Sequence, residues 1–292
     1  MSEYPCTFVN NGKGEPIPFP PFITQQTMDS LTNQFVVHKD DVFVVAYPKC
    51  GTTWLEQVVH LILNGGEQGE QRITDAAPWL EMLPNREGGM AAFLQTLQGQ
   101  RLFTCHLPIA LMPDFTAEKG KYIYVARNPK DTAVSYYYHD QSKFGYDGSW
   151  ADHLTLFMQG KLMFGSYFDH VLPWWQASQT TPNILFLKYE DMKRDLAGTV
   201  GQIADFLGVE MKRPLLEQVV AGSSFQAMST NKKTNFDWVP QREGAPTHFR
   251  KGVIGDWRNH FTAEQSQYFD QVYTAKMRGS QLQFDFGEDE DG

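Results

Sequence analysis

Residues 42–54 read VFVVAYPKCGTTW, an apolar run followed directly by a short polar turn. The apolar run predicts a buried strand over Val42–Tyr47, and a helix is expected to open at about Trp54. Backbone N–H groups at a helix start have no intrahelical partner, Gly51 lets the chain pass close to a ligand, and Lys49 adds positive charge. The segment therefore predicts an anion-binding loop at the carboxyl end of a strand.

Three further runs of the chain have the composition of buried strands. They are RLFTCH at Arg101–His106, KYIYVA at Lys121–Ala126 and NILFLKY at Asn183–Tyr189, and helical stretches follow most of them. This alternation predicts one α/β domain over residues 1–292, P-loop-like, with a central, mostly parallel sheet flanked by helices on both faces.

Helix boundaries can also be predicted from the residues that favour them. Asn128 is expected to be an N-cap with Pro129 at the first helical position, and Thr262 with Gln265 forms a capping box. Gly279 is expected to end that last helix. Residues 66–99 and 230–246 predict two long loops, and the acidic residues 287–292 predict a disordered tail.

The composition excludes several classes of partner. The formal charge of -9 argues against a nucleic-acid or anionic-membrane partner, which would need a basic face. The three cysteines lack the spacing of a disulfide framework or a zinc site, and neither a signal peptide nor a run of about 18 apolar residues is present. We expect a soluble, cytoplasmic protein.

A second anion contact is predicted where the strand KYIYVA ends. Arg127 follows that strand, and Ser135 lies two turns into the helix that begins there. A guanidinium at a strand end can hold a phosphate in bidentate fashion, although a lone arginine most often forms a surface ion pair. The order G-x-x-x-x-G-K-[ST] of a Walker A loop is absent, which argues against a kinase or nucleoside triphosphatase.

Three long motifs together resemble one family. YPKCGTTW is similar to the YPKSGTTW loop of the cytosolic sulfotransferases, YVARNPKDTAVSYYYH to their second strand–helix element, and RKGVIGDWRNHFT, from Arg250, to their RKGxxGDWKNxFT element. The resemblance runs from about Pro18 to Phe286. It implies 3′-phosphoadenosine 5′-phosphosulfate (PAPS) as sulfuryl donor, its desulfated form PAP as product, and a small-molecule acceptor.

The same resemblance assigns the donor site residue by residue. The loop that holds the phosphosulfate would comprise Lys49, Cys50, Gly51, Thr52 and Thr53, and the 3′-phosphate would meet Arg127, Ser135, Arg250, Lys251 and Gly252. Adenine would lie between Trp54 and Phe225, with Tyr189, Ser223 and Met228 nearby, as stacking on flat apolar faces suits a purine.

For the chemistry, the resemblance makes His106 the general base that takes the proton of the acceptor. Lys49 would stabilise the charge that develops on the leaving oxygen, and no metal is expected. Thr104 stands where the family has lysine, and Cys50 stands where it has serine. A sulfotransferase-like nucleotide-binding protein with weakened or no catalysis is therefore the alternative.

Two cysteines belong to segments that should border the site. A thiol at a helix N-terminus beside Lys49 predicts a lowered pKa and a reactive Cys50, which bound nucleotide would protect. The alternative is that Cys50 and Cys105 are buried, inert thiols.

The acceptor pocket and the assembly follow from weaker signals. Trp79, His106, His139, Phe144 and Tyr167 are expected to line the acceptor pocket, which suits a phenol or polycycle. His139 and Asp140 also leave a polar or cationic acceptor open. The family's dimer motif KxxFTVxxxE reads RNHFTAEQSQ from Arg258, so a monomer or weak homodimer is expected.

Overall fold

The computed structural model describes residues 4–10, 12, 15–97, 99–244 and 246–287. Its central sheet has four parallel strands in the order β4-β3-β5-β6. The strands are β3 (Val42–Val45), β4 (Leu102–Cys105), β5 (Lys121–Ala126) and β6 (Ile184–Lys188). All four lie within the ranges that the sequence predicts, so the predicted parallel α/β fold is confirmed.

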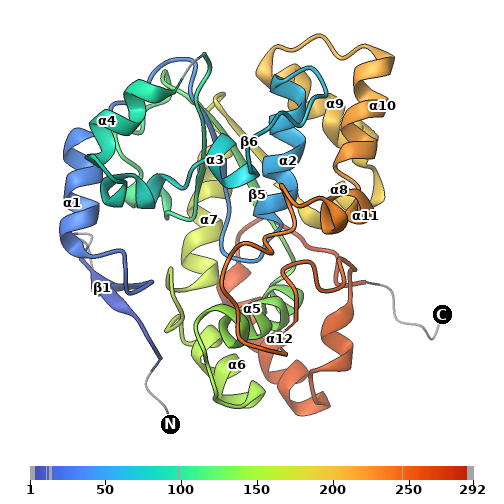
Figure 1. Cartoon of the computed structure of the whole chain (residues 1–292). Helices are drawn as coiled ribbons and strands as arrows, with labels where there is room; N and C mark the ends of the chain where they lie inside the picture. Colours follow the sequence, from blue (N-terminus) through green and yellow to red (C-terminus); the bar gives the residue numbers. More distant parts are fainter. Residues whose placement is uncertain (1–3, 11, 13–14, 98, 245, 288–292) are drawn as a thin grey trace.

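Helices cover both faces of this sheet, as Figure 1 shows. On β5, the alternate residues Tyr122 and Tyr124 turn toward Trp174 of helix α7 (Tyr167–Ser178), and Tyr124 stacks on that indole at 5.5 Å. Successive side chains of a strand point to opposite faces, so Ile123 and Val125 face the other side. Both faces are apolar because both are buried.

Helix α2 (Thr52–Leu63) packs on β3 and β4 and is itself covered by α9 (Leu196–Leu207) and α10 (Arg213–Gly222). The predicted apolar residues Leu55, Val58, Val59 and Ile62 are all buried. Glu56, Gln57 and His60 of the same helix are buried as well, which periodicity does not predict. The helix begins at Thr52, two residues earlier than expected.

The predicted helix ends agree with the structure. Asn128 caps α5 (Pro129–Lys143) by accepting a hydrogen bond from the Asp131 N–H. Thr262 and Gln265 form the capping box of α12 (Ala263–Met277), and Gly279 follows this helix with a φ of 80°. These ends depend on residues close in the chain, which is why the sequence predicts them.

The stretch 66–99 is not one long loop, and that prediction is wrong. It holds α3 (Ile73–Ala76), the 3-10 helix η1 (Leu80–Asn85) and α4 (Gly89–Thr96), which bury Ile73, Leu80, Leu83 and Met90. Such short elements are stabilised by packing rather than by propensity. In contrast, the predicted loop 230–246 holds only the last residue of a helix, Thr230, and its other described residues contain neither helix nor strand.

The chain ends add two features that the sequence analysis does not predict. An antiparallel pair joins β1 (Thr7–Val9) to β2 (Ile17–Phe19). At the other end, Gly287 donates its N–H to Asp285 and its carbonyl accepts from Arg258, so disorder is wrong for this residue. The rest of the predicted tail, residues 288–292, lies outside the described residues.

The remaining elements complete the layers around the sheet. They are α1 (Gln25–Gln34), η2 (Ile109–Leu111), α6 (Trp150–Met158), α8 (Tyr189–Arg194), α11 (Phe225–Thr230) and η3 (Asp256–Asn259). Among the described helices, none is both long and apolar enough to span a membrane.

Candidate active site

A cavity of about 780 Å³ opens where β3, β4 and β5 end, the edge at which open α/β sheets bind ligands. Most of the residues that the sequence predicts for the donor and acceptor sites line it. These are Lys49, Gly51, Thr52, Thr53, Trp54, Trp79, His106, Arg127, Ser135, His139, Phe144, Tyr189, Phe225, Met228, Arg250, Lys251 and Gly252. Segments distant in the sequence therefore meet in one cavity.

The phosphate loop has the backbone geometry of an anion cradle. Gly51 has a φ of 104°, and a Cβ there would lie 2.7 Å from the Tyr189 ring, so only glycine fits. Lys49 is also left-handed, with a φ of 69°. The Thr52 hydroxyl is buried with no hydrogen-bond partner, and the first N–H groups of α2 have no intrahelical acceptor. Unpaired donors at this point suit an anionic oxygen.

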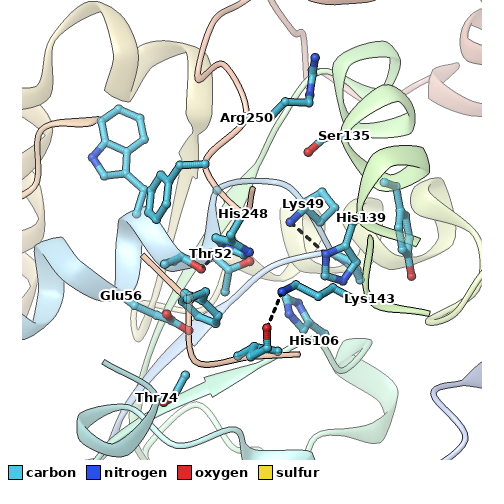
Figure 2. Close-up of a pocket in the computed structure, with 18 of the residues that line it drawn as sticks. Lys49, Thr52, Glu56, Thr74, His106, Ser135, His139, Lys143, His248 and Arg250 are labelled. Atoms are coloured by element: carbon cyan, nitrogen blue, oxygen red, sulfur yellow. Dashed lines mark hydrogen bonds between the residues drawn. The ribbon is translucent and has the colours of Figure 1, made fainter. Parts of the chain in front are cut away.

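Lys49 carries its charge into the cavity. Its Nζ lies 3.4 Å from Nδ1 of His139, and a dashed line marks this contact in Figure 2. Burial lowers the pKa of Lys49 to about 8. Burial and then the Lys49 charge hold the pKa of His139 well below its usual value, so His139 is neutral and accepts the hydrogen bond. An anion at the loop would raise the pKa of Lys49 again, because an opposite charge nearby favours the ammonium.

The second group of cations lies on the far side of the loop. Arg127 donates to the Val253 carbonyl at 2.9 Å, whereas its buried Nε has no partner. Arg250 and Lys251 each pair with Asp256 at 2.6 Å. Although burial alone would raise the pKa of Asp256, the hydrogen bonds from these cations hold it well below its usual range. Asp256 of η3 therefore orients both cations, and Figure 2 shows Arg250 beside Ser135.

A flat, aromatic part of the cavity lies next to these cations. The Trp54 indole N–H donates to the Ser223 carbonyl at 2.8 Å, which fixes the ring, and the ring meets Tyr189 edge-on at 5.3 Å. Phe225 is 38% exposed although it is a large aromatic residue. Gly252 approaches it so closely that a Cβ would lie 2.5 Å from the Phe225 ring. These faces are suited to a planar base.

His106 follows β4 and is held on three sides. Its Nδ1 lies 2.7 Å from the Ala46 carbonyl, its backbone N–H donates to Glu81, and its carbonyl accepts from His170 Nε2 at 2.9 Å. Because a carbonyl only accepts, Nδ1 carries the proton and Nε2 keeps its lone pair. Burial lowers the pKa of His106 to about 4, so the ring is neutral at pH 7.

Three predicted site residues do not line the cavity. The Cys50 thiol turns away toward Thr132, 3.6 Å from its hydroxyl, and the backbone N–H of Cys50 donates to the Tyr47 carbonyl. The Ser223 hydroxyl donates to Val219, so only the carbonyl of Ser223 contributes, by holding Trp54. The Tyr167 hydroxyl donates to the Arg127 carbonyl at 2.6 Å. Each side chain is used in packing, which sequence spacing does not reveal.

The predicted reactivity of Cys50 is also wrong. Burial raises the pKa of its thiol to about 12, and the Thr132 hydrogen bond opposes this only in part. Cys105 is buried as well, with its pKa raised by burial. Asp140, beside His139, does not line the cavity either, because its carboxylate is bonded to Tyr4 and to His153 at 2.9 Å. The inert-thiol alternative is the one that agrees with the structure.

Sequence reasoning missed several cavity residues. Lys143 extends from the end of α5 and donates to the Val239 carbonyl at 3.1 Å, and His248 lies 3.2 Å from the Thr53 hydroxyl. The loop 231–246 contributes Phe236, which stacks on His248 at 4.2 Å. The sequence shows the charge of Lys143 but not its direction. Other lining residues that were not predicted include Pro20, Phe22, Glu56, Thr74, Met82, Met163, Phe164, Val239 and Phe249.

The described part of the chain holds no group of three or more histidine, cysteine, aspartate or glutamate residues that could bind a metal ion.

A sulfotransferase domain model matches residues 39–281. This chain belongs to the sulfotransferase family. The match covers every segment that lines the cavity except the loop between β2 and α1.

Known sulfotransferases resemble this chain over most of its length. Mouse sulfotransferase 2A2 is 39% identical over 91% of this chain and 94% of its own length, and dog sulfotransferase 1B1 is 38% identical over 86% and 88%. A mouse sulfotransferase, SULT7A1, solved in complex with PAP, is 33% identical and superposes with a TM-score of 0.74 over 90% of this chain and 92% of that one. Retinol dehydratase, at 23% identity, shares the fold with a TM-score of 0.82 over 96% and 92%.

Proposed function

We propose that this sulfotransferase moves a sulfuryl group from PAPS to a hydroxyl or amine of a small, aromatic or polycyclic acceptor, with His106 as general base. One observation carries the proposal: the hydrogen bond from His106 Nδ1 to the Ala46 carbonyl leaves Nε2 as a bare acceptor in the cavity that the phosphate loop lines. A base and an anion cradle thus share one cavity, which is what sulfuryl transfer requires.

The residues present fit PAPS. Thr52 and Arg127 keep buried donors without partners, and Gly51 and Gly252 leave no room for a side chain. Lys49, Thr52 and Thr53 would hold the phosphosulfate, whereas Arg127, Ser135, Arg250 and Lys251 would hold the 3′-phosphate. Trp54 and Phe225 would enclose the adenine. The bound donor supplies an activated sulfuryl group, and the protein supplies position and charge.

Transfer then requires a proton acceptor and a cation. His106 Nε2 takes the proton of the acceptor as the new bond to sulfur forms and the bond from sulfur to the phosphate oxygen breaks. Lys49 belongs to the phosphate loop and lines the cavity, where its ammonium stabilises the negative charge left on that oxygen. The neutral ring of His139 accepts a hydrogen bond from Lys49 and so orients the Lys49 ammonium. A positioned base of this kind contributes about 100- to 10,000-fold.

Thr104 limits the rate that this arrangement can reach. It is buried, its hydroxyl has no partner, and it does not line the cavity, so no cation replaces the expected lysine there. Lys49 carries that role alone. A protein that binds PAP but transfers nothing is the second candidate, favoured by this one substitution.

The experiment is incubation of the protein with radiolabelled PAPS and a panel of phenols, steroids, amines and alcohols. Transfer to at least one acceptor is expected, and His106→Ala should lose at least about 100-fold in turnover while its affinity for PAP stays within about twofold. Full turnover by His106→Ala would exclude His106 as the base. Protection against heat by PAP without transfer would favour the binding protein.

We also infer that the protein acts in the cytoplasm as a monomer or weak homodimer, without nucleic acid or membrane. The odd, sparse cysteines support a reducing compartment. Arg258, at the start of the altered dimer motif, donates to the carbonyls of Phe286 and Gly287 of its own chain. That use within one chain leaves the motif poorly suited to pairing across subunits.

A further inference from the structure

One cavity-lining side chain has no role in the proposed chemistry. Glu56 lies one turn after Thr52 on α2, is 2% exposed and lines the cavity, and its Oε2 has no hydrogen-bond partner. Leaving such a group unpaired costs about 1–3 kcal/mol, a cost that a ligand donating to Glu56 would offset.

The charge of Glu56 contrasts with the rest of the cavity. Among the described residues that line it, Glu56 is the only acidic one, whereas the cations include Lys49, Arg127, Arg250 and Lys251 at the donor site and also Lys143. An ionised carboxylate would repel an anionic donor. The cations of the donor site are therefore explained by the donor, and Glu56 is not.

The position of Glu56 points to the acceptor. Figure 2 shows Glu56 and Thr74 on one side of the cavity, across from His106 and Lys143. An acceptor whose nucleophile lies at His106 can thus extend a second group toward Glu56. Aromatic residues, including Trp79 and Phe236, line the same cavity and suit the ring between the two groups.

We propose that Glu56 selects acceptors that carry an ammonium group in addition to the nucleophilic hydroxyl, by pairing with that ammonium. The proposal rests on the proposed function of the site. An ammonium is a strong hydrogen-bond donor, so it can satisfy the unpaired Glu56 Oε2. Among the described residues that line the cavity, Glu56 is also the only one whose side chain can carry the negative charge that an ammonium needs as its partner.

The ionisation of Glu56 is consistent with this geometry. Burial raises the pKa of its carboxyl to about 7, and the neighbouring Thr104 hydroxyl opposes the shift only in part. An arriving ammonium lowers that pKa again, because an opposite charge nearby favours the carboxylate. Glu56 thus ionises more fully when a cationic acceptor binds.

The test uses phenols in matched pairs, in which one member carries an amino group at the end of its side chain and the other does not, such as tyramine and 4-ethylphenol. The pairs have side chains of one to three carbons, and the best pair is the one whose amine is turned over most efficiently. For the best pair, Glu56→Gln should lower kcat/KM for the amine at least about tenfold and leave the alkylphenol within about twofold. Glu56→Asp, which keeps the charge, should retain part of the preference. Thermal melts show that each variant is folded.

Equal effects of Glu56→Gln on both members of each pair, or no effect on any amine, would overturn the proposal. Binding of both series to the PAP-loaded protein is measured by calorimetry in parallel. If no acceptor of the wider panel is sulfated, the proposed function fails, yet Glu56 is still judged by binding of these phenols: the substitution must weaken binding of the amine and not of the alkylphenol. Equal binding of the amine to wild type and Glu56→Gln would then reject the role of Glu56.

Discussion

Lys49 is the residue whose charge depends most directly on what the cavity holds. Burial lowers its pKa to about 8, and an anion at the loop raises it. The protonated form binds the anion, so affinity for PAP is present below about pH 8 and should fall as the pH rises through that value. Titration calorimetry between pH 7 and 9.5 measures this slope.

Lys49→Met is the matched test of that assignment. It removes the charge but keeps most of the side-chain volume, and it should weaken PAP at pH 7 by about tenfold or more, since hydrogen bonds to charged groups contribute about 1.5–3 kcal/mol. The variant should also lose the pH dependence near 8. An unchanged slope in Lys49→Met would assign the titration to another group.

The thiol of Cys50 gives a second prediction at this scale. With its pKa raised to about 12 by burial, it is protonated at pH 8, so iodoacetamide should modify the partly exposed Cys6 well before Cys50 or Cys105. Peptide mass spectrometry with and without PAP measures the rates. Rapid labelling of Cys50 that PAP prevents would contradict the buried geometry.

At the scale of elements, the turn between Arg250 and η3 joins the proposed 3′-phosphate site to the proposed adenine site. Gly252 has a φ of 66° and touches Phe225, whereas Gly279, after α12, has a φ of 80° and open space where a Cβ would lie. Both glycines are left-handed, so alanine strains each by about 1–2 kcal/mol. Only at Gly252 does the methyl group also displace the Phe225 ring.

Gly252→Ala should therefore weaken PAP binding by about tenfold or more, while Gly279→Ala should lower the free energy of unfolding and leave PAP affinity unchanged. Chemical denaturation and calorimetry on both variants separate strain from contact. Similar PAP affinities in the two variants would mean that the Gly252–Phe225 contact does not shape the site.

Elements also differ in how far the sequence predicts them. The four parallel strands and the caps at Asn128 and Thr262 follow from neighbouring residues, and the structure has them. The short helices of residues 66–99 were missed because packing, not local propensity, stabilises them. The strands β1 and β2 were missed too, because each is stabilised by pairing with the other and not by its own sequence.

At the scale of the whole molecule, the assembly is the property that the altered dimer motif affects. Arg258 bonds to carbonyls of its own chain, so sedimentation velocity at micromolar concentration should give mainly monomer. Arg258→Lys shortens the side chain and loses its fork of donors, and it should lower stability by about 1 kcal/mol without creating a dimer. A tight dimer in the wild type would overturn the monomer prediction.

Short motifs along the chain were enough to identify the family and to predict a donor site. A short motif specifies the backbone of a phosphate loop, so Lys49, Gly51 and Thr52 could be predicted for the donor site from their neighbours alone. The packing of distant elements decides which way the side chains of Cys50, Ser223 and Tyr167 point. It also decides that Lys143, His248 and Glu56 line the same cavity. Which face of a buried helix meets a cavity is set by the layers around it, and only the folded chain contains those layers.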